Sequence, residues 1–186
     1  MHGAEEPSAW VVRWARLVAP GAAVLDLACG GGRHARYFAA RGAMVDAVDR
    51  DAGAGAALAG VDRVRFLAAD LEGGPWPYAG RRFDAVIVTN YLHRPLFGPL
   101  LAALAPGGVL IYETFAQGNA QFGKPSNPVF LLAPGELLRH CASLHVLAYE
   151  DGTTQLPRPA RVQRICALAE GADADAARLR LDGPAE

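Results

Sequence analysis

Short apolar runs alternate with segments of helical periodicity along most of the chain. The short runs are typical of buried strands, whereas the segments between them repeat apolar positions every three or four residues, as amphipathic helices do. The predicted strands are 23–28, 43–48, 64–68, 83–89, 109–114, 144–150 and 162–168, and the predicted helices are 8–19, 33–41, 51–60, 96–105 and 134–141. This alternation predicts an α/β fold in which helices cover both faces of one sheet.

Individual segments refine this pattern. The run FDAVIVT at 83–89 is almost continuously apolar, which indicates a parallel strand buried on both faces. Pro106 and the two glycines after it are expected to end the preceding helix, and Pro134 is expected in the first turn of the last one. The stretch 115–128 is rich in Gly, Asn, Gln and Pro and is too long for a simple connection, so we expect a lid or a binding loop there.

Length and net charge limit the number of domains and the kinds of partner that we expect. The chain has 186 residues, enough for one domain with a hydrophobic core, and its net charge is −1. A near-neutral total gives no general drive toward nucleic acid or an anionic membrane, although a local basic patch is compatible with it. We therefore expect one domain over 1–170, a disordered acidic tail over 171–186, and neither nucleic acid nor a membrane as the partner.

The sequence also indicates a bacterial, cytoplasmic protein. Lys124 is the only lysine, and the high alanine and glycine content is typical of a GC-rich genome. The first residues lack the features of a signal peptide, and no stretch approaches the ~18 uninterrupted apolar residues of a membrane span. Cys29, Cys141 and Cys166 lie far apart without metal-ligand spacing, so we expect reduced, buried thiols.

The first candidate functional residues lie in VLDLACGGG, where a predicted strand continues into a glycine turn and then a helix. Glycines let the backbone approach a ligand closely, and free N–H groups at a helix start favour negative charge. Both dinucleotides and S-adenosylmethionine (SAM) bind at such turns, and 30–35 satisfies the loose G-x-G-x-x-G/A pattern. Asp26 favours SAM, because a carboxylate there repels a pyrophosphate but pairs with the amino group of a methionine moiety.

Two further acids follow the next two predicted strands. Asp49 can accept hydrogen bonds from both hydroxyls of a ribose, and Asp70 can accept one from the exocyclic amine of adenine. Open α/β sheets bind ligands at the carboxyl ends of their strands, so Asp26, Asp49 and Asp70 are expected together at one edge. The sequence thus predicts a site for SAM.

Five segments resemble the motifs of class I SAM-dependent methyltransferases, and the resemblance spans about 10–168. The segments are VLDLACGGGRHARYFA, AVDRD, AADLE, FDAVIVTNYLHR and LAPGGVLIYETF. The resemblance implies a Rossmann-like, seven-stranded and mostly parallel sheet with helices on both faces and an antiparallel last strand. It also implies SAM as cofactor and S-adenosylhomocysteine as product. The cofactor contacts that it implies are Asp26, Ala28, Gly30, Gly32, Asp49, Arg50, Asp70, Leu71 and Asn90.

The chain departs from the family at Ala28, where a glycine is usual. Within the superfamily it is most similar to the tellurite-resistance (TehB-like) group. The similarity lies in the compact size and in the C-terminal segments PVFLLAPGELLRH, VLAYEDG and RVQRICALA.

The acceptor is expected beside TNYLHR at 89–94 and the loop that follows the fifth strand. His93 is the candidate base, with a capping or positioning role as the alternative, and Tyr91 is a candidate for positioning the acceptor. The candidate substrate-binding residues are His34, Arg94, Glu113, Asn119, Phe122 and Lys124. No metal set and no base with an orienting partner is visible, which favours a small, soft acceptor such as a thiol or a metalloid oxyanion like tellurite or selenite.

Three alternatives stay open at this point. An RNA or protein methyltransferase would share the same cofactor motifs, and so would a SAM-binding module without catalytic activity. A nicotinamide-dependent oxidoreductase is the remote alternative, because its Tyr-x-x-x-Lys pattern is missing around Lys124.

Overall fold

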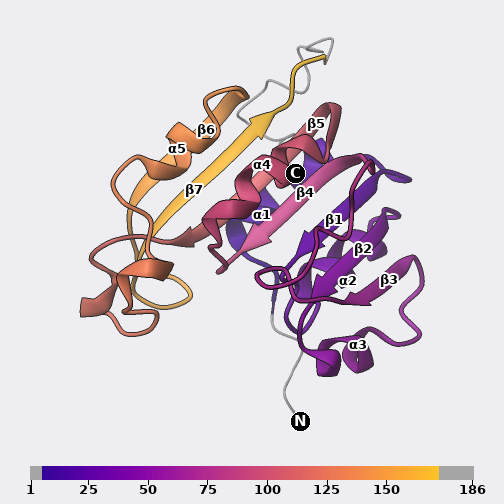
Figure 1. Ribbon diagram of the computed structural model, residues 1–186, viewed down its shortest axis with the longest axis horizontal. Coiled ribbons are helices and arrows are strands. Elements are labelled where there is room, and N and C mark those ends of the chain that lie inside the picture. Colours follow the sequence, from indigo (N-terminus) through magenta and orange to yellow (C-terminus); the bar gives the residue numbers. More distant parts are fainter. Residues whose placement is uncertain (1–5, 172–186) are drawn as a thin grey trace.

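The computed structural model describes residues 6–171, which form a seven-stranded sheet in the order β3-β2-β1-β4-β5-β7-β6 (Figure 1). The strands are β1 Ala23–Leu27, β2 Met44–Asp49, β3 Val64–Ala68, β4 Phe83–Thr89, β5 Leu104–Phe115, β6 His145–Thr154 and β7 Ala160–Leu168. Strands β1 to β5 are parallel, and β7 inserts antiparallel between β5 and β6. The predicted Rossmann-like methyltransferase topology with an antiparallel last strand is confirmed.

Helices cover both faces of the sheet. The α-helices are α1 Ala9–Trp14, α2 Arg33–Ala40, α3 Ala52–Leu58, α4 Phe97–Ala102 and α5 Glu136–His140. Apolar side chains of α1, α2 and α3 form one core cluster with the sheet, and those of α4 and α5 form a second cluster on the opposite face. Figure 1 shows α4 in front of the sheet.

The strand pleat divides the core between these two clusters. Val24 belongs to the α1–α3 side and Leu25 to the α4–α5 side, because successive side chains of a strand point to opposite faces. Trp14 and Phe38, both fully buried, fill the first side. Burying a large side chain of this kind contributes roughly 2–3 kcal/mol of stability, so both helices are fixed against the sheet.

Pro106 does not end the preceding helix, contrary to the sequence prediction. That helix ends at Ala102, and β5 already begins at Leu104. The ladder between β4 and β5 has an irregularity that accommodates the extra residues. A Cβ on Gly108 would lie 2.9 Å from the carbonyl oxygens of Ala105 and Phe83, so the glycine permits this close pairing.

Two helix starts and ends also differ from the prediction. The first helix is α-helical only to Trp14 and continues as a 3-10 turn over Ala15–Leu17. Pro134 lies outside α5, whose N-cap is Gly135 in the left-handed conformation, while the Glu136 carboxylate accepts from the Ala133 N–H. The ends of α1 and α5 are therefore set by local hydrogen bonds of the capping residues and not by the position of proline.

The predicted tail at 171–186 lies, except for its first residue, outside the described residues. Among residues 6–171, no helix has both the length and the apolar character needed to cross a membrane.

Candidate cofactor and acceptor site

A left-handed turn joins β1 to α2 at the carboxyl end of the sheet. Ala28, Gly30 and Gly32 have φ angles of +52°, +51° and +73°. A Cβ on Gly32 would lie 2.5 Å from the side chain of Leu58, so glycine is required there for packing as well as for conformation. Ala28 carries a Cβ in a conformation that costs a residue with a side chain roughly 1–2 kcal/mol.

A second strained residue lies at the end of the adjacent strand. Asn90 directly follows β4 and has a φ of +56°. Strands β1 and β4 pair in parallel, so Ala28 and Asn90 lie at the same edge of the sheet, which we name the strand-end edge. Of the non-glycine residues with positive φ among residues 6–171, only Arg63 lies elsewhere. Backbone strain of this kind concentrates at functional sites.

The Asp49 carboxylate ties the glycine turn to the chain after β2. Its Oδ2 accepts a 2.8 Å hydrogen bond from the Gly30 N–H, and its Oδ1 accepts a 2.9 Å bond from the Asp51 N–H. Each carboxylate oxygen retains a second lone pair, so Asp49 can still accept from ligand hydroxyls.

Asp26 lies buried beneath the first turn of α2. Its side chain is 1% exposed, and its Oδ2 has no hydrogen-bond partner within the described part of the chain. Burial raises the pKa of this carboxyl to about 7, although a hydrogen bond from the Ala35 backbone acts in the opposite direction. A buried carboxyl oxygen without a partner is unfavourable in the free protein, and a ligand cation would relieve this.

A cavity of about 160 Å³ opens at the strand-end edge, and we name it the first cavity. Its lining residues are Ala28, Asp49, Arg50, Ala69, Asp70, Leu71, Glu72 and Tyr91. Backbone hydrogen bonds from Glu72 and Gly73 hold the pKa of the Asp70 carboxyl below its usual value, so this side chain presents an anion. Asp49, the last residue of β2, and Asp70, which follows β3, therefore line one cavity beside Ala28, whereas Asp26 lies outside its lining.

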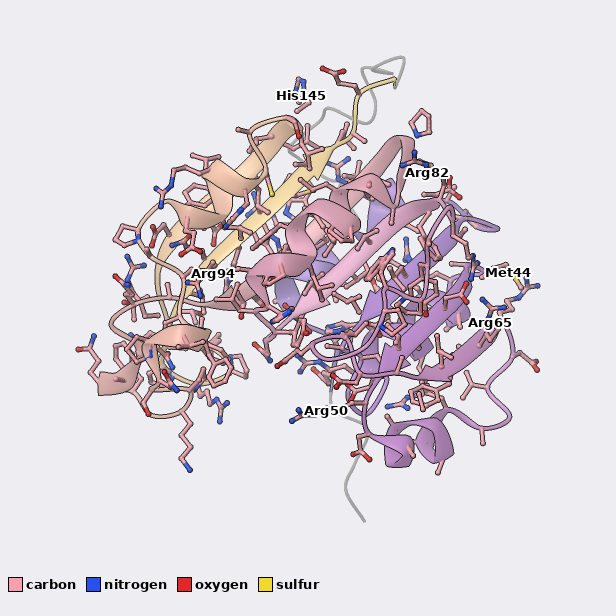
Figure 2. The ribbon with its side chains drawn as sticks, viewed as in Figure 1. Met44, Arg50, Arg65, Arg82, Arg94 and His145 are labelled. Carbon is pink, nitrogen blue, oxygen red and sulfur yellow. The ribbon has the colours of Figure 1, made fainter. Side chains whose placement is uncertain are left out.

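The residues labelled in Figure 2 locate this edge in the molecule. Arg50, which follows β2, lies at the lower centre of the view and Arg94, which follows β4, lies on the left, whereas Met44 and Arg82, at the starts of the same strands, lie on the right.

A second cavity has a volume of about 440 Å³. Its lining residues are Asn90, Phe115, Lys124, Pro125, Ser126, Asn127, Phe130 and Arg158. The linings of the two cavities meet at consecutive residues, since Asn90 lines the second and Tyr91 lines the first. The edge thus offers an acidic compartment and, beside it, a larger compartment without carboxylates in its lining.

Residues 24–108 match a protein-family profile described as a methyltransferase domain. This segment, a little under half of the chain, is similar to methyltransferase domains. The matched segment contains the glycine turn, Asp26 in β1, Asp49 at the end of β2 and Asp70 after β3.

Several solved structures share the fold of this chain, whereas no curated protein matches the sequence significantly. TehB from Haemophilus influenzae superimposes with a TM-score of 0.73 at 19% identity, covering 88% of this chain and 63% of TehB. The chain therefore spans less than two thirds of the length of TehB. A Burkholderia thailandensis 1,6-didemethyltoxoflavin-N1-methyltransferase, solved with 1,6-didemethyltoxoflavin and S-adenosylhomocysteine, gives a TM-score of 0.61 at 23% identity, covering 87% and 76%. The [4+2]-cyclase SpnF gives 0.68 at 16% identity, covering 88% and 79%.

The side chain of Arg94 is held by hydrogen bonds within the protein. Its guanidinium donates to both carboxylate oxygens of Glu136 and to the carbonyls of Val129 and Leu131. These four bonds occupy four of the five N–H donors of an arginine. Arg94 therefore fastens α5 and the preceding loop to the end of β4, and it lines neither cavity, which argues against the substrate-binding role predicted for it.

Asn119 is likewise engaged within the domain. Its Nδ2 donates to the Pro125 carbonyl at 3.0 Å and its Oδ1 accepts from the Arg161 N–H at 3.0 Å. The side chain is 1% exposed. Asn119 therefore holds the loop after β5 against the hairpin of β6 and β7, and of the three loop candidates only Lys124 lines the second cavity, since Phe122 lies outside its lining.

His34 and Glu113 meet through Ser8. The Ser8 N–H donates to Nε2 of His34, and the Ser8 hydroxyl donates to the Glu113 carboxylate at 2.7 Å. Glu113 also pairs with Arg164 on β7. Burial lowers the pKa of His34 to about 3, so its imidazole is neutral at physiological pH. These polar groups attach the start of α1 to the sheet rather than lining either cavity.

The two catalytic candidates differ in placement. Tyr91 lines the first cavity, and burial together with the nearby charge of Glu72 raises the pKa of its phenol, which stays protonated. His93 caps the 3-10 turn Arg94–Leu96 and lies outside both cavity linings. Among residues 6–171, no group of His, Cys, Asp and Glu is arranged to hold a metal ion.

Several residues that line the cavities were not predicted from the sequence. Glu72 and Ala69 line the first cavity, and Phe115, Phe130 and Arg158 line the second. The only available signal was position beside a predicted strand end or loop. All three cysteines are buried and free, as expected.

Proposed function

We propose that the protein transfers the methyl group of SAM to a small molecule bound in the second cavity. The observation that carries the proposal is the convergence of Asp49 and Asp70 with the strained Ala28 turn around the first cavity, directly beside the second. Fold alone is insufficient, because a [4+2]-cyclase shares this architecture.

The residues present fit the cofactor chemically. The unpartnered oxygen of Asp26 suits the ammonium group of the methionine moiety, which would neutralise a buried carboxylate. Asp49 has free lone pairs for the two ribose hydroxyls, and Asp70 with Leu71 offers an acceptor and an apolar surface for adenine. The turn glycines Gly30 and Gly32 bring backbone close to the ligand. We assign cofactor contacts also to Arg50, which lines the first cavity, and to Asn90, which lines the second.

The protein's own contribution is to position the reactants. When bound, SAM supplies an electrophilic methyl group on a sulfonium. Methyl transfer is an in-line displacement, so alignment of the two compartments at Asn90 and Tyr91 is the principal requirement. Tyr91 keeps its proton and can orient an acceptor by donating a hydrogen bond.

The acceptor is proposed to be soft, either a thiol or a metalloid oxyanion. Neither cavity is lined by a histidine, and His34 is a buried, neutral residue that accepts from Ser8. An acceptor that ionises readily by itself requires no general base. His93 is the base candidate if a hydroxyl acceptor is used instead.

Calorimetry and a product-linked assay test this function. We expect SAM and S-adenosylhomocysteine to bind with micromolar-range affinity, and S-adenosylhomocysteine to be released with thiols or metalloid oxyanions. Binding of NAD without SAM would refute the proposal. Turnover confined to RNA and abolished by nuclease would preserve methyl transfer but move the acceptor to nucleic acid.

A further inference from the structure

The lining of the second cavity has a distinct chemical composition. It combines two cations, Lys124 and Arg158, with the phenyl rings of Phe115 and Phe130. The other lining residues are Asn90, Pro125, Ser126 and Asn127, which carry no charge. From this cavity we infer that the methyl acceptor is an organic anion, with a flat apolar body and a carboxylate group. The inference rests on the proposed methyl transfer and names the acceptor class for it.

The two cations are not neutralised by neighbouring acids. Within residues 6–171 no carboxylate forms an ion pair with Lys124 or Arg158, whereas Arg161 and Arg164, on the strand that follows Arg158, pair with Asp151 and with Glu113. The second cavity therefore keeps a local positive charge although the net charge of the chain is −1. An anion bound between the two cations would receive charge-assisted hydrogen bonds from both.

Apolar surface accompanies this charge. Phe115 is 9% exposed and forms a buried part of the lining, while Phe130 is 46% exposed. Two more apolar residues on the same loops, Val129 and Leu156, are 63% and 78% exposed. The two phenyl rings in the lining favour a ligand with apolar area, so of the two acceptor classes proposed above the cavity favours an organic thiol over an inorganic oxyanion.

The placement of the cations gives the acceptor an orientation. Lys124 lies in the segment after β5 and Arg158 in the turn between β6 and β7, whereas Asn90 belongs to the strand-end edge. If Lys124 and Arg158 hold the carboxylate of a flat molecule, the opposite end of that molecule points toward Asn90 and the first cavity. The group to be methylated would then lie at that end.

Matched acids and esters test the inference. The probes are 4-mercaptobenzoate and its neutral methyl ester, which carry the same thiol. In the reaction the thiolate lone pair forms the new bond to the methyl carbon, the sulfonium sulfur keeps the electron pair of the broken bond, and the thiol proton goes to water. We expect kcat/KM for the acid to exceed that for the ester by roughly tenfold or more, the factor given by one charge-assisted contact.

Three variants localise the effect. Lys124→Met and Arg158→Met should each raise KM for the acid by roughly tenfold while leaving the ester unchanged. Arg82→Met is the control, because Arg82 is an exposed arginine at the opposite edge of the sheet (Figure 2). Equal losses with acid and ester, or an equal loss in Arg82→Met, would overturn the role of the two cations.

Binding provides an independent readout when turnover is absent. Calorimetry on the protein saturated with S-adenosylhomocysteine compares 4-(methylthio)benzoate with its methyl ester. Tighter binding of the anion, weakened in both cavity variants, supports the inference; equal or tighter binding of the ester overturns it. Failure of S-adenosylhomocysteine to bind at all would instead refute the proposed function, so the two failures are distinguishable.

Discussion

The backbone amide of Ser8 donates a 3.1 Å hydrogen bond to Nε2 of His34, 26 residues further along the chain. His34 lies in the first turn of α2, directly after the glycine turn, and its Nδ1 lies 3.5 Å from the Thr89 hydroxyl. Because Nε2 accepts, the ring proton is assigned to Nδ1. The start of α1 is thus tied to the residues around the cofactor turn through one neutral imidazole.

This contact predicts acid sensitivity. Burial lowers the pKa of His34 to about 3, so the contribution of its neutral form is complete above the unfolded pKa of ~6.5 and is lost as pH falls toward 3. Relative to His34→Gln, the wild-type protein should lose roughly 2–3 kcal/mol of unfolding free energy between pH 7 and pH 4. Urea unfolding at several pH values measures this difference. A constant difference between the two proteins across this range would show that His34 is not buried as a neutral ring.

For Asp26 we expect the opposite dependence of stability on pH, over an overlapping pH range. Burial raises the pKa of its carboxyl to about 7, so the folded protein favours the protonated form, and stability falls as pH rises from ~4 to above 7. Asp26→Asn should therefore gain roughly 2–4 kcal/mol relative to wild type on going from pH 4 to pH 8, while binding SAM more weakly. Thermal melts with and without SAM check both effects. Weaker stability of the variant at every pH, with unchanged SAM affinity, would contradict the proposed role.

Ala28 predicts a stabilising substitution. Its φ of +52° is strained for alanine, so Ala28→Gly relieves ~1–2 kcal/mol, partly offset by the ~0.5–1 kcal/mol entropic cost of a glycine. We expect a net gain of about 0.5–1 kcal/mol in denaturant unfolding. The control is Ala57→Gly at an exposed position in α3, which should lose about the same amount. Destabilisation by Ala28→Gly would mean that the alanine methyl contributes packing that outweighs the strain.

Asp49 predicts a specific loss of cofactor affinity. Asp49→Ala removes an acceptor that the proposal assigns to both ribose hydroxyls and should weaken SAM binding by roughly 2–3 kcal/mol. Asp51→Ala is the matched control, because Asp51 caps α3 through the Gly53 N–H and lines neither cavity. The control should lose about 1 kcal/mol of stability without a change in affinity. If calorimetry gave the same SAM affinity for both variants, Asp49 would have only a structural role.

Asn119 predicts how the loop after β5 moves. It bonds the Pro125 carbonyl and the Arg161 amide, so it restrains the loop on both sides. Amides of 120–127 should exchange faster than those of β4, slow down when acceptor binds, and exchange faster still in Asn119→Ala. Gln121→Ala, which removes only a local contact with Gly118, serves as the control. Protection equal to that of β4 in every state would argue against a moving lid.

The alternation of strands and helices was sufficient to predict most of the architecture. Strands such as 64–68 and 83–89 agree with the structure at both ends, because each is a short apolar run bounded by polar residues or turn residues, although only 83–89 is largely buried. The glycine turn and the acids near the carboxyl ends of β1, β2 and β3 could also be predicted, because the carboxyl ends of parallel strands lie at one edge of the sheet. These features depend on local sequence alone.

The acceptor side depended on tertiary structure. Arg94 and Lys124 are both basic residues in or beside loops, yet four hydrogen bonds fix the first to α5 and its preceding loop while the second lines a cavity. Arg158 reaches that cavity only because β7 returns antiparallel beside β5 and brings a distant turn to the strand-end edge. The sequence by itself determined where the cofactor turn and its acids lie, since those positions follow from adjacent strands and their ends. Which cations remain free of partners was decided by long-range packing, because a pairing partner is set by position in space and not by separation along the chain.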